Sequence, residues 1–111
     1  MKNTKAKPMK EIMYRESRIA KAFGEPAKYS IINFLIINGP ANVTEIAKAV
    51  HRHIATVSFH LAKLKALEIV RFEEKSDGTY YWIKYPEEVK SILKALNTFV
   101  KRTLTRVYED I

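Results

Sequence analysis

A turn of three residues between two short helices, followed at once by a hairpin, is the feature that most constrains how this chain can fold. The turn is His51-Arg52-His53, and apolar residues recur at helical spacing on both sides of it. After the second helix, two runs of β-branched and aromatic residues flank Ser76-Asp77-Gly78, and Asp-Gly between such runs is a strong hairpin signal. This order of elements predicts a winged helix-turn-helix, which is a mostly α fold with a small β-hairpin.

Local signals set the boundaries of these elements. The helix-turn-helix is expected at about residues 42–66, because Asn42 at the N-cap and Glu45 three residues later can form a capping box. The wing is expected at about residues 69–85. Within the second helix, four apolar residues fall at spacings of three and four, and we expect them to face the core: Ile54, Val57, Leu61 and Leu64.

The opposite face of that helix is small, polar and basic apart from Phe59. Small side chains let a helix enter the major groove closely, basic ones neutralise phosphates, and hydroxyls or imidazoles can hydrogen-bond base edges. An ordinary solvated helix face is the alternative, but the wing that follows favours DNA. The predicted DNA-binding residues are Arg52, His53, Ala55, Thr56, Ser58, Phe59, His60, Lys63, Lys75 and Thr79.

The N-terminal part of the chain is predicted to hold a tail and two helices. Residues 1–9 are Lys-rich and read as a flexible basic tail, and a first helix follows until Gly24. Glu25-Pro26 opens the second helix, since proline is pre-organised for the first helical position. The apolar run at residues 31–37 could be a buried strand, but the stop at Gly39-Pro40 makes a unit long enough to favour a buried helix.

The last predicted helix spans about residues 87–108 and completes a single domain over residues 10–108. Its apolar stripe is longer than one small domain needs, and pairing with a second subunit would bury it. We therefore expect a C-terminal dimerisation helix. Its predicted interface residues are Ile92, Leu96, Phe99, Val100 and Leu104.

Composition limits the partners and the chemistry of the chain. With 111 residues it has room for one domain, and with no cysteine it has no disulfide, thiolate metal site or thiol sensor. No apolar stretch is long enough to span a membrane and no secretory signal is recognisable, so we expect a cytoplasmic protein that binds no membrane. The net charge of +8 indicates a polyanionic partner such as nucleic acid, although basic surfaces also serve solubility.

The residues from Phe23 to Ile83 resemble the core of ArsR-type winged helix-turn-helix transcriptional regulators. The resemblance rests on the order and spacing of several short pieces: Glu25-Pro26, Gly39-Pro40, Val43-Thr44-Glu45-Ile46-Ala47, Thr56-Val57-Ser58-Phe59-His60-Leu61, and Gly78 to Ile83. It implies a homodimer that pairs through long N- and C-terminal dimerisation helices and binds double-stranded DNA at a near-palindromic operator, as a repressor. Ile12, Ile19 and Phe23 of the first helix would then join the dimer interface. The helix after the turn would lie in the major groove, and the hairpin would touch the minor groove or the backbone.

Four positions depart from the pattern of these regulators. His51 and Glu68 stand where the family often has glycine, so a positive φ at either residue carries a mild cost. His53 stands where a serine commonly caps the second helix, and it is a weaker cap. Phe59 stands where an arginine is common, so the operator sequence of relatives does not transfer to this chain.

Many proteins of this type respond to metals, but the residues here argue against a metal site. One family site uses cysteines in the third helix, where this chain has Asn42 and Thr44, and another uses Asp and His on the last helix, which has neither. The remaining histidines are poorly spaced to surround one ion: His51, His53 and His60. We predict a non-metal-sensing variant with no cofactor.

An enzyme is not expected, because the chain lacks a Gly-rich phosphate loop and a nucleophile with a facing base. The sequence thus predicts a sequence-specific transcriptional regulator. Two alternatives stay open: an architectural protein that coats DNA without sequence preference, and a winged helix used for contact with other proteins.

Overall fold

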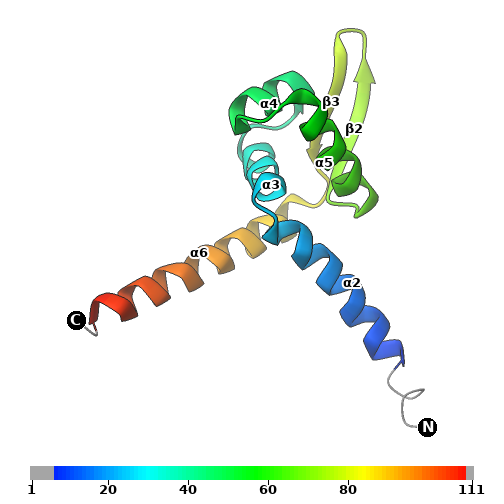
Figure 1. Ribbon diagram of the computed structural model, residues 1–111. Coiled ribbons are helices and arrows are strands. Elements are labelled where there is room, and N and C mark those ends of the chain that lie inside the picture. Colours follow the sequence, from blue (N-terminus) through cyan, green and yellow to red (C-terminus); the bar gives the residue numbers. More distant parts are fainter. Residues whose placement is uncertain (1–6, 110–111) are drawn as a thin grey trace.

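The computed structural model describes residues 7–109, which form five helices and a three-stranded antiparallel sheet (Figure 1). In chain order the elements are α2 (Lys7–Gly24), α3 (Pro26–Asn38), β1 (Ala41–Asn42), α4 (Val43–Val50), α5 (Ile54–Ala66), β2 (Val70–Lys75), β3 (Gly78–Ile83) and α6 (Pro86–Glu109). The predicted winged helix-turn-helix is confirmed, with α4 and α5 as the helix pair and β2 with β3 as the wing.

The core is built around α3, which is apolar on nearly every side. Ile31 and Ile32 are fully buried, and contacts reach α3 from α2, α4, α5, β3 and α6. The apolar run at residues 31–37 is therefore a buried helix, as its length and flanking residues predict. The buried core residues are Ala22, Phe23, Ile31, Ile32, Leu35, Ala41, Ile46, Ala47, Val57, Leu61, Leu64, Ile69, Val70, Ile83 and Val89.

Side-chain caps fix where α3 and α4 begin. The Glu25 carboxylate accepts a hydrogen bond from the Lys28 backbone N–H at 2.8 Å, and this bond lowers the pKa of Glu25. The predicted capping box of α4 is also present. Asn42 Oδ1 accepts from the Glu45 N–H at 2.8 Å, and Glu45 Oε1 accepts from the Asn42 N–H at 2.9 Å.

The two expected left-handed positions end the two helices of the pair. His51 follows α4 with a φ of 57°, and Glu68 lies just beyond α5 with a φ of 67°. The reversal at His51 lets the Arg52 N–H donate to the Ala47 carbonyl at 3.1 Å. Each turn therefore depends on a backbone conformation that glycine adopts more easily.

The wing is a regular hairpin whose register runs from Val70 opposite Ile83 to Lys75 opposite Gly78. A third strand, β1, pairs with the other edge of β3 and was not predicted. It has only two residues, so it carries no sequence periodicity, and its position depends on the contact between the α3–α4 connection and the sheet. The fold thus has a small sheet in place of a lone hairpin.

Two predictions need correction. Residues 7–9, which the sequence assigns to a flexible tail, belong to α2, because that helix begins at Lys7; residues 1–6 lie outside the described part of the chain. Ile54 is predicted to be buried, but 50% of it is exposed. As the first residue of α5, it lies beyond the edge of the core that Val57 and Leu61 fill.

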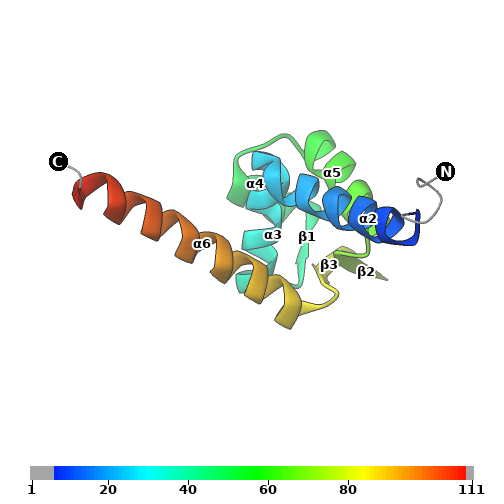
Figure 2. The same ribbon diagram turned by 90° about the horizontal axis from the view of Figure 1, so that it is seen from below.

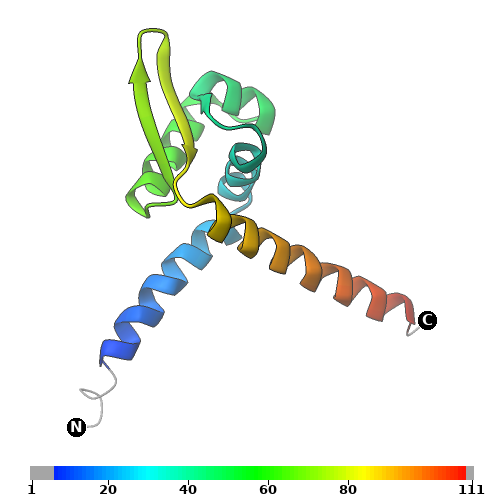
Figure 3. The same ribbon diagram turned by 180° about the vertical axis from the view of Figure 1, so that it is seen from behind.

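The two long helices leave the core in different directions (Figures 1 and 3). The free ends of α2 and α6 lie on the side of the molecule away from the wing tip, and Figure 2 shows the two helices extending to opposite sides. The Cα radius of gyration is 17.1 Å, against about 13 Å for a compact domain of about 100 residues. Much of each long helix therefore lacks a partner within the described chain.

The left-handed conformation of His51 leads to a stability prediction. His51→Gly should raise the free energy of unfolding by roughly 1 kcal/mol, because glycine adopts this conformation without the Cβ penalty. Ala49→Gly in α4 is the matched control and should lower it by roughly 0.5–1 kcal/mol. Chemical denaturation measures both changes, and two equally destabilised variants would contradict the expected relief at His51.

Candidate nucleic-acid interface

The face of α5 that carries small, polar and basic residues and Phe59 lies toward solvent, as its sequence pattern predicts. Val57, Leu61 and Leu64 are fully buried and anchor the opposite face in the core. The predicted contact residues Ala55, Ser58, Phe59 and Lys63 are exposed, whereas Thr56 and His60 are half-buried at the margins of this face. The outer face of α5 is thus positioned by the core and is open to a partner.

Phe59 is the large apolar side chain on this outer face, with 59% of it exposed. The Lys63 ammonium nitrogen lies 4.7 Å from the centre of its ring, within the range of a cation–π contact. The His60 ring lies 6.0 Å away and is tilted by 57°. Contacts with these two neighbours favour some orientations of the ring over others.

The turn between α4 and α5 forms a shallow basic hollow of about 570 Å³. Arg52 and His53, both predicted DNA contacts, line it together with His51 and Lys48. His53 makes no side-chain hydrogen bond to the start of α5, which agrees with its weakness as a cap. Lys48 is missing from the predicted set, although its position in the last turn of α4 could have indicated it.

The wing carries the two remaining predicted contacts on opposite faces. Lys75 pairs with Gly78, and Thr79 pairs with Glu74, the residue before Lys75. Successive residues of a strand point to opposite faces, so the side chains of Lys75 and Thr79 lie on different sides of the hairpin. Lys75 is exposed and its ammonium nitrogen lies 5.6 Å from the Tyr80 ring centre. The Tyr80 hydroxyl donates to Asp77 at 2.9 Å, and this bond raises the pKa of Tyr80.

Two contacts hold the wing against the end of α5. The Lys84 ammonium donates to the Glu68 carboxylate, which lowers the pKa of Glu68 and raises that of Lys84. The Lys65 ammonium nitrogen lies 4.3 Å from the Phe72 ring centre. Because these groups are partly exposed, we assign them a role in the angle between α5 and the wing rather than in stability.

His60 joins the outer face of α5 to the core. Its Nδ1 is buried and has no hydrogen-bond partner among the described residues. Burial lowers the pKa of His60, an effect that Glu25 partly offsets and that Lys28, Arg52 and Lys63 reinforce. The imidazole is therefore neutral at pH 7, and it lies at the margin of the interface, as expected.

A second surface runs along α2 and α6. Val89 and Leu93 near the start of α6 pack against the core, but the stripe beyond them is open. The exposed residues of the predicted dimer interface are Ile12, Ile19, Ile92, Leu96, Phe99, Val100 and Leu104. Exposed apolar side chains in continuous rows on two helices indicate a protein interface.

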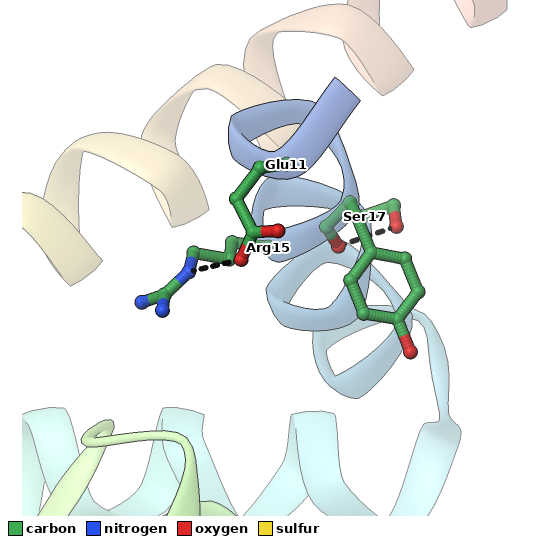
Figure 4. A network of polar contacts seen from close by, with 4 residues as sticks. Glu11, Arg15 and Ser17 are labelled. Carbon is green, nitrogen blue, oxygen red and sulfur yellow. Dashed lines mark hydrogen bonds and ion pairs between the residues drawn. The ribbon is translucent and has the colours of Figure 1, made fainter. Parts of the chain in front are cut away.

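Polar contacts on α2 are made within that helix. The Arg15 Nε donates to the Glu11 carboxylate at 3.3 Å, and the Ser17 hydroxyl donates to the Tyr14 carbonyl at 2.7 Å (Figure 4). Pairs separated by three or four residues stabilise a helix locally. They do not engage α6, so they leave the apolar rows of both helices uncovered.

Where α2 and α6 diverge, an apolar hollow of about 420 Å³ lies between Ile19 and Phe23 on one side and Ile92 and Leu96 on the other. Phe23, which the sequence assigns to the dimer interface, is only 7% exposed and belongs to the core of its own subunit. It lines the floor of the hollow because the C-terminal end of α2 packs on α3.

Two further properties concern residues 7–109 alone. No three histidine, aspartate or glutamate side chains are grouped there in a way that could hold a metal ion. No helix in this range is both long and apolar enough to cross a membrane. The lack of a metal cofactor stays a prediction.

Comparison with known proteins decides the family. The HVO_A0114 family model matches residues 25–89, which is more than half of the 111 residues and covers α3 to the first turn of α6. The chain belongs to the HVO_A0114 family. The uncharacterized HTH-type transcriptional regulator MJ1325 of Methanocaldococcus jannaschii is 31% identical over 83 residues, which are 75% of this chain and 92% of that relative.

Solved structures confirm the winged helix-turn-helix fold of this HVO_A0114 family member. The homodimeric winged helix-turn-helix DNA-binding domain of Mb0332 from Mycobacterium bovis, a possible ArsR-family regulator, superposes with a TM-score of 0.76 at 22% identity, covering 88% of this chain and 89% of that one. The transcriptional repressor PagR of Bacillus anthracis gives 0.66 at 27% identity, covering 78% and 97%.

The lowered pKa of His60 leads to a prediction for stability against pH. The unfolded chain takes up a proton at His60 near the ordinary pKa of 6.5 and the folded chain only at lower pH. The contribution of the neutral His60 to the free energy of unfolding should thus be complete above pH 6.5, and the free energy of unfolding should fall as the pH decreases below that value.

His60→Leu should remove this part of the pH dependence, while His53→Asn, which changes an exposed histidine, should keep it. Chemical denaturation between about pH 5 and pH 8 measures the effect, since histidine charge changes in that range. Identical pH profiles for the wild-type protein and His60→Leu would contradict the assignment.

Proposed function

We propose that this chain is a sequence-specific, double-stranded DNA-binding transcriptional repressor that acts as a cytoplasmic homodimer on a near-palindromic operator. The observation that carries the proposal is the outer face of α5, which is small and basic and is continuous with the basic hollow of the turn. Between Lys48 and Lys65 the chain has no acidic residue. Such a surface suits a groove lined by phosphates.

The wing and the turn extend this surface on both sides of α5. In the proposed complex α5 lies in the major groove, the basic side chains of the turn contact phosphates, and Lys75 of the wing reaches the backbone or the minor groove. The basic residues of the turn fix the position on DNA without carrying sequence information. Base recognition then depends on the outer residues of α5.

We base the proposed dimer on the exposed apolar residues along α2 and α6. The apolar rows on α2 and α6 lie on the side of the molecule away from the wing tip (Figure 1). A partner that covers them leaves both DNA-contacting surfaces free. Two copies related by a two-fold axis would then present two α5 helices to successive major grooves, which explains a near-palindromic operator.

An architectural role is the second candidate, and one observation favours it. α5 has no Arg, Asn, Gln, Asp or Glu, so its two lysines are its only side chains of the types that make paired contacts with base edges. A protein that binds phosphates alone would have the same charge and the same salt dependence. Only the ratio of specific to non-specific affinity separates the two roles.

Selection of binding sites from a random duplex pool at about physiological salt tests the proposed function. We expect enrichment of an inverted repeat with half-sites about one helical turn apart. Retained DNA without an enriched sequence would favour the architectural role. No retained DNA would favour a winged helix that contacts proteins.

The dimer interface has its own test. Leu96→Glu with Phe99→Glu places two charges in the apolar row of α6, so the dimer should dissociate in sedimentation or light scattering. Ser91→Glu with Thr98→Glu is the matched control, because it adds the same charge at exposed polar positions of α6 that are not part of its apolar row, and it should stay dimeric. A folded, unaltered dimer of the first variant would contradict the interface.

A further inference from the structure

The position of Phe59 suggests how α5 distinguishes base pairs. Phe59 points directly away from the buried row formed by Val57, Leu61 and Leu64. Its neighbours on the outer face one turn away are small, with Ala55 four residues before it and Ala62 three residues after. A helix that approaches bases with this face brings the Phe59 ring to them first.

The Phe59 ring has two side-chain neighbours before any DNA is bound. The Lys63 ammonium lies 4.7 Å from its centre, and the tilted ring of the half-buried His60 lies at 6.0 Å. These contacts favour some orientations of the ring over others, and an apolar group with fewer accessible orientations loses less conformational entropy on binding.

The chemistry of the remaining outer residues limits what else can identify bases. Lysine can contact guanine, but the Lys63 ammonium lies against the Phe59 ring and Lys65 lies at the C-terminal end of α5 against Phe72. The other polar side chains of α5 are Thr56, Ser58 and His60. Hydroxyls can bond to more than one base and discriminate weakly. In the major groove the apolar feature of a base pair is the 5-methyl group of thymine, and a phenyl ring is complementary to it.

We infer that Phe59 is a specificity-determining residue that contacts the 5-methyl group of one thymine in each operator half-site. This inference rests on the proposed function, because it requires a sequence-specific complex with α5 in the major groove. Phe59 excludes water from the methyl group and leaves the hydrogen-bonding atoms of the base pair unused. Cytosine methylated at carbon 5 carries the same group at the same place in the groove and binds equally well.

A thymine-to-uracil scan of the selected operator tests the inference with the full-length protein. Uracil keeps the base pairing and removes only the methyl group. At one position in the half-site, uracil should weaken binding about fourfold, the effect of exposing one methylene-sized group. The same change in both half-sites should weaken it about fifteenfold if the two contacts are independent. Fluorescence anisotropy measures the dissociation constants.

The variants assign the effect to Phe59. Phe59→Ala should bind operators with thymine or uracil at that position equally well. The wild-type protein should bind an operator with 5-methylcytosine there more tightly than one with cytosine, and as tightly as the operator with thymine. Ile37→Ala is the matched control, since Ile37 is a highly exposed apolar residue on α3, outside α4, α5 and the wing. It should keep the full difference between thymine and uracil.

The outcomes separate the inference from the proposed function. If site selection finds no enriched sequence, the proposed function fails before the scan begins. If a specific operator exists but uracil has no effect at any position, the inference is wrong and the proposed function stands. An effect that persists in Phe59→Ala also overturns the inference, because another residue then contacts the methyl group. The uracil scan of the wild-type protein does not depend on the folding of any variant.

Discussion

The burial of α3 is the constraint on which the rest of the structure depends. A helix that buries Ile31, Ile32 and Leu35 needs partners over its buried face, and α2, α4, α5, β3 and α6 supply them. At about 25 cal/mol for each Å² of apolar surface, this burial is the main term that opposes the loss of chain entropy. Because α5 must turn its apolar face to α3, its Phe59 face is left for solvent or for a partner. The position of the candidate interface is therefore a consequence of packing.

The same packing separates the two unpartnered surfaces of the molecule. Only the ends of α2 and α6 near the core take part in it, through Phe23 and Val89, so the remaining apolar rows extend away from the wing. A second subunit placed there does not compete with DNA for α5. If the apolar rows lay beside α5, a second subunit would cover α5, and dimerisation and DNA binding would exclude each other. In the proposed dimer, one subunit can therefore orient the DNA-binding surface of the other.

Sequence reasoning succeeded where the signal is local and failed where tertiary contacts decide. The capping box at Asn42 and the positive φ angles of His51 and Glu68 follow from residues within a few positions of each other. β1 has no local signal, since two residues form a strand only because β3 lies beside them. Ile54 matches the apolar period of α5 yet is half exposed, because the period does not show where the core ends. For the candidate interface, sequence spacing identified the outer face of α5. It did not place Lys63 against the Phe59 ring.

Because α5 has few side chains that make paired contacts with base edges, the proposed function requires two copies of it on one operator. One methyl contact changes affinity about fourfold, whereas specific and non-specific affinities commonly differ by at least about a thousandfold. In the proposed complex, two copies of Phe59 would therefore supply only part of this ratio. Thr56, Ser58, His60 and Lys63, acting in both half-sites, and sequence-dependent DNA shape would have to supply the remainder.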